Sequence, residues 1–158
     1  MKIDDRQLLY DLFAAYYDAR KHKRNTKSQL DFELRLEENM IRLYDELRSR
    51  RYSPSPCICF VTTEPVTREV FASQFRDCVV HDLLYNYISQ ILERTFIFDS
   101  YSCRKEKGTL KALERYEHHI RSCSDNYTRD CYILQLDLKG YFMSINKQIL
   151  YGLLCDSL

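Results

Sequence analysis

Residues 131–146 read CYILQLDLKGYFMSIN, an apolar run that carries one aspartate, Asp137, and breaks at Gly140 before two aromatic residues. Its β-branched and aromatic residues predict a strand over residues 131–138, with alternate side chains sharing one face. A carboxylate at the end of such a strand is costly to bury unless a metal ion or hydrogen-bond donors compensate it. The run therefore predicts either a metal-binding aspartate or an ordinary capping or surface aspartate.

The residues that follow Asp137 suit a metal-bound nucleotide. The carbonyl oxygen of Leu138 is a hard ligand of the kind that Mg²⁺ prefers. A sharp turn at Gly140 presents backbone N–H groups to an anion such as a phosphate, and Phe142 then forms a flat wall. Strand, aspartate, turn and aromatic ring together fit a nucleotide-polymerising site, although the pattern alone favours a capping or surface role for Asp137.

The rest of the chain predicts long helices and one hairpin, since it has only three glycines and three prolines. Apolar residues recur at three and four positions, which predicts helices over residues 4–19, 28–50, 78–92 and 109–122 and another that opens at 146. Ser28 fits the N-cap of the second helix, with Asp31 in the position of a capping box. The stretches CICFVTT (57–63) and REVFASQF (68–75) predict a hairpin that turns at Glu64–Pro65.

Composition indicates a globular chain, with 45% hydrophobic and 30% charged residues. The 24 basic and 23 acidic residues leave a net charge of +1, so total charge neither favours nor excludes a polyanionic partner. The N-terminus lacks the apolar region of a signal peptide, and no apolar stretch is long enough to span a membrane. We therefore expect no signal peptide, no membrane partner and a cytoplasmic location. The seven cysteines are odd in number and form no C-x-x-C pair, which favours reduced thiols over disulfides or zinc.

Three segments resemble one protein family in order and spacing. Residues 134–146, LQLDLKGYFMSIN, resemble the first aspartate motif of the palm in reverse transcriptases of bacterial and group II intron-like type, roughly D-I-K-x-[YF]-F-x-S-I-[DN]. Residues 66–88 resemble the fingers hairpin and its R-D-x-V-V-H helix. Residues 98–113, FDSYSCRKEKGTLKAL, resemble the S-Y-x-C-R-x-G-K-G-T-x-x-A block. These forms are closest to the enzymes of diversity-generating retroelements, and the resemblance covers about residues 50–158.

This resemblance implies an α+β, mostly helical chain with a fingers β-hairpin and one palm strand, an incomplete fingers-palm polymerase fold. We expect residues 1–50 to form an N-terminal helical extension, residues 51–130 the fingers region, and residues 131–158 the start of the palm. The second acidic pair of the family lies in a Y-x-D-D type motif that has no match here. We therefore expect the N-terminal part of an enzyme, inactive by itself.

The implied activity is that of an RNA-directed DNA polymerase, which extends a DNA primer on an RNA template with dNTPs. The resemblance assigns Asp137 to both Mg²⁺ ions of a two-metal phosphoryl transfer, with the carbonyl of Leu138 on the second ion. Phe142 would select dNTPs over rNTPs by clashing with a 2′-OH. The other residues that it implies for dNTP binding are Arg68, Gly140 and Tyr141, and those for template or primer phosphates are Arg76, Arg104 and Lys107.

Two departures from the family pattern bear on these roles. Cys78 stands where the family has a second arginine, and Val66–Thr67 precede Arg68 where the family often has a lysine. An accessory protein of the retroelement is a further expected partner. The alternative functions are a non-catalytic nucleic-acid or protein-binding fingers-like module, and an untemplated polymerase of a defence system.

Two other clusters are better explained without a ligand. The basic run Arg20–Lys27 reads RKHKRNTK and contains no acid, yet charge runs usually face water, which favours a solvated helix end over an RNA contact. His118 and His119 have no histidine or cysteine four residues away, so they indicate a surface helix rather than a metal site.

Overall fold

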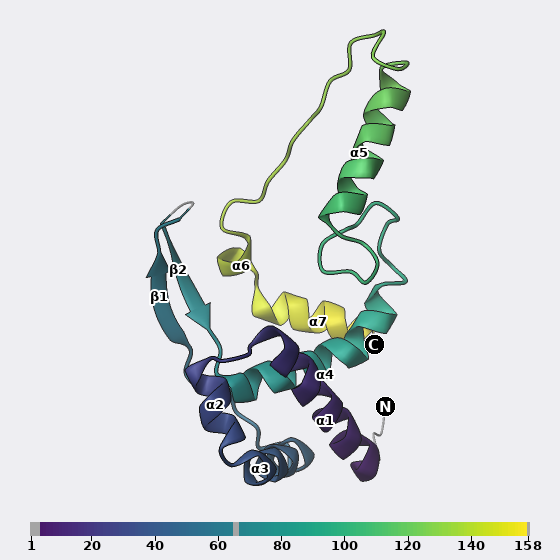
Figure 1. The fold of residues 1–158 in the computed structure, drawn as a ribbon. Coiled ribbons are helices and arrows are strands. Elements are labelled where there is room, and N and C mark those ends of the chain that lie inside the picture. The colour runs from purple at the N-terminus through teal and green to yellow at the C-terminus, as the bar shows by residue number, and fades with distance from the viewer. Residues whose placement is uncertain (1–3, 65–66, 158) are drawn as a thin grey trace. The chain divides into compact units, whose positions relative to one another are not determined.

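The computed structural model describes residues 4–64 and 67–157 and divides the chain into two compact units, residues 1–90 and 91–158 (Figure 1). Helices make up most of the regular structure in both units, and the described residues contain one two-stranded antiparallel sheet. The expected mostly helical α+β class is therefore confirmed at this level. In the part of the chain that is described, none of the helices has the length and apolar character needed to cross a membrane.

The core of the first unit lies among α1 (Asp5–His22), α2 (Lys27–Glu33), α3 (Leu36–Arg48) and α4 (Phe75–Leu92). The ring of Phe75 is central, because it packs edge-on against Tyr16 at 6.1 Å and Phe32 at 5.5 Å between centroids. Tyr16 also donates to Glu33 at 2.6 Å, which ties α1 to α2. The buried apolar residues are Leu12, Ala15, Tyr16, Ala19, Phe32, Met40, Leu43, Phe75, Val79, Val80 and Leu83.

The single helix predicted over residues 28–50 is wrong, because α2 ends at Glu33 and α3 begins at Leu36. Apolar periodicity continues across the break, so the sequence pattern hides it. The Asn39 side chain donates to the carbonyl of Phe32 at 2.9 Å and so satisfies one of the orphan acceptors at the end of α2. A helix end that is stabilised from the next helix leaves no local stop signal.

The predicted N-cap at Ser28 is also wrong. Thr26 caps α2, since its hydroxyl accepts from the backbone N–H of Gln29 at 3.3 Å. The hydroxyl of Ser28 instead accepts from the N–H of Phe75 at 2.8 Å and donates to Gln74 at 2.9 Å. It thus satisfies the start of α4, which begins at Phe75 rather than after Asp77 as predicted.

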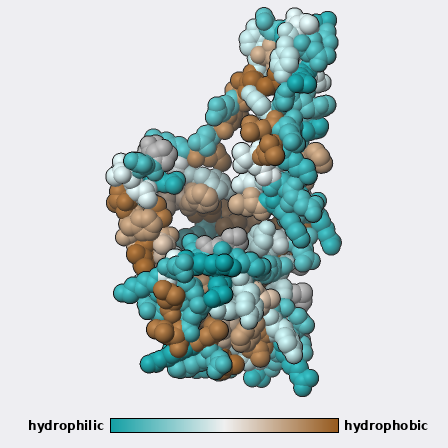
Figure 2. Space-filling model, viewed as in Figure 1, coloured by the Kyte–Doolittle hydropathy of each residue, from teal (hydrophilic) through white to brown (hydrophobic). Residues whose placement is uncertain are grey.

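The predicted hairpin is confirmed, but its return strand is shorter than the predicted 68–75, because Phe75 already begins α4. Strand β1 (Ile58–Thr62) pairs antiparallel with β2 (Arg68–Ala72), in a register that sets Ile58 opposite Ala72 and Thr62 opposite Arg68. The predicted turn includes Pro65, which lies outside the described residues. The hairpin projects from the helices of its unit, and Figure 2 shows apolar side chains exposed along it. Those about half exposed are Ile58, Phe60, Val61 and Phe71.

The second unit contains α5 (Thr109–Cys123), the short α6 (Tyr141–Ser144) and α7 (Lys147–Ser157), so the helices predicted at 109–122 and from 146 are confirmed. After α5 the chain runs back extended toward α6 (Figure 1). The strand predicted over residues 131–138 is wrong: this segment has no ladder partner among the described residues. Tyr132, Leu134 and Leu136 are each more than 80% exposed. An extended segment becomes a strand only when a neighbour takes up its backbone hydrogen bonds.

Candidate nucleic-acid interface

Arg68 is the first residue of β2, next to the hairpin turn, as predicted. Its side chain is exposed, and no acid among the described residues lies within ion-pairing distance of it. The guanidinium is therefore available to an external anion such as a phosphate.

Cys78, at the position where the resembling family has an arginine, is half-buried against the core of the first unit. Burial raises the pKa of its thiol, and the Sγ lies 3.9 Å from the carbonyl oxygen of Ser73. The side chain at position 78 therefore packs against protein and does not present a cation to solvent.

Arg76 is held by protein groups on several sides. Its guanidinium lies 5.0 Å from the centre of the Tyr52 ring, pairs with Glu46 and donates to the carbonyl of Ser53 at 3.1 Å. Asp77 is only 2% exposed and accepts from the Tyr52 hydroxyl at 2.7 Å. Burial and this hydrogen bond raise the pKa of Tyr52. The pair Arg76–Asp77 thus fastens the proline-containing segment before β1 to the start of α4.

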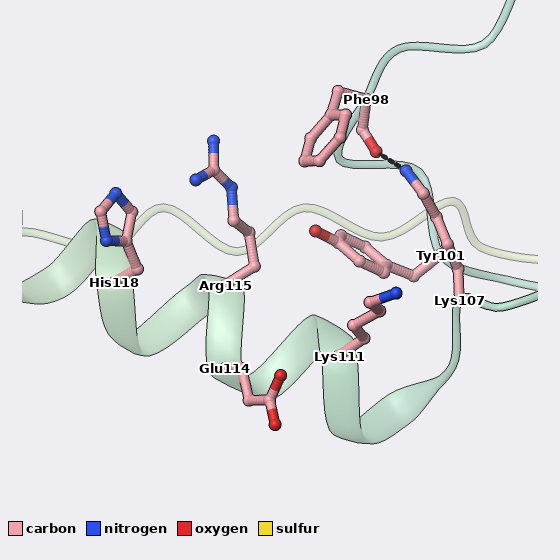
Figure 3. Close-up of a pocket in the computed structure, with 7 residues that line it drawn as sticks. All are labelled: Phe98, Tyr101, Lys107, Lys111, Glu114, Arg115 and His118. Atoms are coloured by element: carbon pink, nitrogen blue, oxygen red, sulfur yellow. Dashed lines mark hydrogen bonds between the residues drawn. The ribbon is translucent and has the colours of Figure 1, made fainter.

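The second unit brings basic and aromatic side chains together around a cavity of about 330 Å³. The cavity lies between the loop that precedes α5 and one face of that helix (Figure 3). We call it the α5 pocket; its lining residues are Phe98, Tyr101, Lys107, Lys111, Glu114, Arg115 and His118. Lys107 is the one lining residue that the sequence resemblance had assigned to nucleic acid.

Two cations of the α5 pocket are positioned by backbone carbonyls. Lys107 donates to the carbonyl of Phe98, and its Nζ lies 4.2 Å from the Phe98 ring centre and 5.1 Å from that of Tyr101. Lys111 donates to the carbonyl of Glu106 at 3.1 Å. A carbonyl fixes an ammonium group without cancelling its charge, so both lysines remain net positive.

Arg104 is placed in a similar way beside the pocket. Its guanidinium donates to the carbonyls of Ile97 at 3.3 Å and Ser100 at 3.2 Å and lies 5.4 Å from the Phe96 ring centre. The Nε of Arg104 is shielded from solvent and has no hydrogen-bond partner among the described residues. The side chain orders the loop while it adds a further positive charge to it.

Asp99 fastens the loop to α5. Its carboxylate accepts from the Tyr101 hydroxyl at 2.9 Å, from Nε of Arg115 at 3.0 Å, and lies 3.1 Å from Nε2 of His119. The Tyr101 hydrogen bond, with those from His119 and Arg115, lowers the pKa of Asp99 to about 2. Tyr101 and Arg115 are therefore held in place by a charged group that stays ionised near neutral pH.

The aspartate motif covers the end of the extended segment and the short helix α6 that follows it. Asp137 and Leu138 are exposed and outside regular structure. Gly140 has φ 63° and ψ 29°, the left-handed conformation that glycine adopts at little cost, and α6 follows at once. Tyr141 and Phe142 stack edge-on at 5.2 Å, and Phe142 is 84% exposed. The predicted sharp turn at Gly140 is therefore confirmed.

The described residues do not make a complete magnesium site. They contain no group of three or more histidine, cysteine, aspartate or glutamate side chains placed to hold a metal ion. The carboxylate of Asp137 and the carbonyl of Leu138 are suitable oxygen ligands, but Mg²⁺ requires near-octahedral coordination. Further acidic ligands would have to be added to these two before a metal ion is held firmly.

Sequence reasoning missed most of the α5 pocket. Lys111, Arg115 and His118 follow one another at i, i+4 and i+7, the spacing that puts side chains on one face of a helix. This spacing can be recognised in the sequence, and it follows directly after the basic residues of the loop that precedes α5. The presence of the Phe98 ring in the pocket could not be predicted, because it depends on how the loop folds back onto α5.

No protein-family model matches this sequence, and no curated protein shows significant similarity to it.

Proposed function

We propose that this chain is the N-terminal part of an RNA-directed DNA polymerase of bacterial retroelement type, with the fingers and the start of the palm. The observation that carries the proposal is the order of three motifs: the hairpin with its Arg-Asp helix, the S-Y-x-C-R block, and the aspartate motif at residues 134–146. Each motif resembles the reverse transcriptases on its own, and the three occur in the family's order and spacing.

The hairpin supports a role in triphosphate binding. Arg68 is exposed beside the turn, without an acidic partner among the described residues, on a two-stranded sheet that projects from its unit. A guanidinium donates in a fork that matches phosphate oxygens. On this proposal Arg68 binds the incoming dNTP.

The aspartate motif supports a role in contacting the deoxyribose of the dNTP and in binding magnesium. The left-handed turn at Gly140 leads directly into α6, and the exposed Phe142 ring offers a flat surface to a deoxyribose. Asp137 and the carbonyl of Leu138 would hold magnesium together with a second acidic motif, which this sequence does not match. Magnesium would supply charge neutralisation for phosphoryl transfer when bound. The chain of 158 residues is therefore proposed to be inactive alone.

Two alternatives remain as competing proposals. The first is a non-catalytic fingers-like module that binds nucleic acid or protein, and the basic α5 pocket supports its nucleic-acid form. An untemplated polymerase of a defence system would share the same motifs. The three proposals differ in whether DNA is made and in whether its sequence follows a template.

The test is primer extension by the complete product of the gene, with Mg²⁺, dNTPs and a DNA primer annealed to RNA of known sequence. The proposal expects DNA whose sequence is the complement of the RNA, no product when the template is omitted, and no product from residues 1–158 alone. DNA that is made equally well without RNA would establish the untemplated polymerase. Binding of RNA without any extension would establish the non-catalytic module.

A further inference from the structure

We infer that the α5 pocket binds one nucleotide of single-stranded RNA, with its base against Phe98 and its phosphate on Lys107 and Lys111. This deepens the proposed function and rests on it only for the choice of RNA over DNA. The rings, the cations and the cavity all belong to the second unit, and the residues that line the site lie within 98–118.

The charge of the pocket favours an anion. Three cations line it, Lys107, Lys111 and Arg115, against one acid, Glu114, which points away from Phe98 and Tyr101 (Figure 3). The Asp99 carboxylate neutralises Arg115 through the 3.0 Å contact. Lys107 and Lys111 keep their charge, because the acceptors that fix them are the backbone carbonyls of Phe98 and Glu106. Two net charges in the lining of one pocket suit the phosphate of a nucleotide.

The rings of the pocket favour a base next to that phosphate. Phe98 is 70% exposed, although a large apolar side chain normally gains by burial. Cations already lie near it, with Lys107 at 4.2 Å and Arg115 at 5.4 Å from its ring centre. An exposed aromatic ring among cations is the combination on which proteins stack bases of single strands.

The size and the geometry favour a single strand over a duplex. The volume of about 330 Å³ falls at the lower end of pockets that hold small ligands. A base in a duplex hides both of its faces in the stack, whereas a single strand offers a free face to Phe98. Lys111, Arg115 and His118 lie along the face of α5 that lines the pocket (Figure 3).

The experiment measures binding of a fluorescein-labelled oligouridine of twelve nucleotides to the 158-residue chain by anisotropy, from 50 to 200 mM salt. Phe98→Leu keeps an apolar side chain but removes the ring, and should weaken binding about 5- to 150-fold, the cost of losing one stacked base. Lys111→Gln should lower the slope of log affinity against log salt by about 0.7, the value for one phosphate contact on a single strand.

The matched control is Arg121→Gln, which removes a cation from the same helix, in an ion pair with Glu117 outside the pocket. It should change neither the affinity nor the slope beyond error. Phe98 and Lys111 are exposed, so both variants should keep the wild-type circular dichroism spectrum. Oligouridine binding that is unchanged in Phe98→Leu and Lys111→Gln would overturn the inference, as would equal competition by an RNA duplex of the same length.

Failure of this inference and failure of the proposed function give different results. The binding assay contains no dNTP and no primer, so it does not depend on catalysis. If the complete gene product extends primers but the pocket variants bind oligouridine normally, only the inference about the α5 pocket is refuted. If the pocket variants lose oligouridine binding but the complete gene product extends no primer, the inference about the α5 pocket stands and the proposed polymerase function is refuted.

Discussion

Tyr52→Phe tests whether the Arg76–Asp77 pair fastens the segment before β1 to α4. The substitution removes one hydroxyl and keeps the ring on which the Arg76 guanidinium stacks at 5.0 Å. It deletes the 2.7 Å hydrogen bond to Oδ1 of Asp77, whose remaining donors are the N–H of Ser55 on Oδ2 at 3.1 Å and Arg76 on Oδ1 at 3.5 Å. Oδ1 is then left with one long contact in a residue only 2% exposed.

The expected loss follows from the charge and burial of the acceptor. A hydrogen bond to a charged group contributes about 1.5–3 kcal/mol to stability, and a buried carboxylate oxygen that loses its partner is not rehydrated. No cavity term is added, because only a hydroxyl is removed. We therefore expect the free energy of unfolding of the first unit to fall by about 1.5–3 kcal/mol.

The assay is native-state hydrogen exchange of the amides of Val79, Val80 and Leu83, which lie buried in α4 and report on the first unit. Tyr44→Phe is the control, since Tyr44 packs on the same core and its hydroxyl makes no hydrogen bond to the described residues. It should change the free energy by less than about 0.5 kcal/mol. A Tyr52→Phe effect as small as that of the control would refute the proposed fastening role.

Three further outcomes are expected. The NMR signal of the Asp99 carboxyl carbon should titrate with a pKa of about 2. The contribution of Asp99 to the attachment of its loop to α5 is then complete above pH 3.8 and is lost as the pH falls through 2. Tyr101→Phe should raise this pKa, because it removes the hydrogen bond that lowers it most. Asn146→Ala should destabilise α7 by about 1 kcal/mol, seen as faster amide exchange, because Oδ1 of Asn146 accepts from the N–H groups of Gln148 and Ile149 at 3.0 and 3.2 Å. In the complete gene product, Phe142→Ala should raise rNTP incorporation relative to dNTP incorporation about 10-fold or more in a competition assay; an unchanged ratio would contradict its role at the sugar.

Local signals were sufficient for the elements whose cause is local. The pairing of β1 with β2 follows from β-branched and aromatic residues on either side of a turn, and α5 follows from apolar residues at helical spacing after Gly108. The left-handed turn at Gly140 follows from the residue that adopts it most readily.

Features that depend on distant residues were not predictable. Ser28 resembles an N-cap of its own helix, yet its hydroxyl serves Phe75, 47 positions away. The strand at residues 131–138 has the right composition but no neighbour to pair with among the described residues. Arg76 was assigned to nucleic acid by resemblance, and only the folded chain shows how Tyr52, Ser53 and Glu46 surround it. The α5 pocket likewise exists only once Asp99 has drawn its loop onto the helix.

Single-turnover dNTP incorporation by an Asp137→Asn variant of the complete gene product tests the claim that Asp137 holds magnesium for nucleotide transfer. The substitution keeps the shape of the side chain and removes its charge. Asp156→Asn, a change of the same kind on the exposed surface of α7, is the control and should incorporate dNTPs at the wild-type rate. We predict that Asp137→Asn incorporates no dNTP above background. Incorporation by Asp137→Asn at the rate of the Asp156→Asn control would contradict the claim.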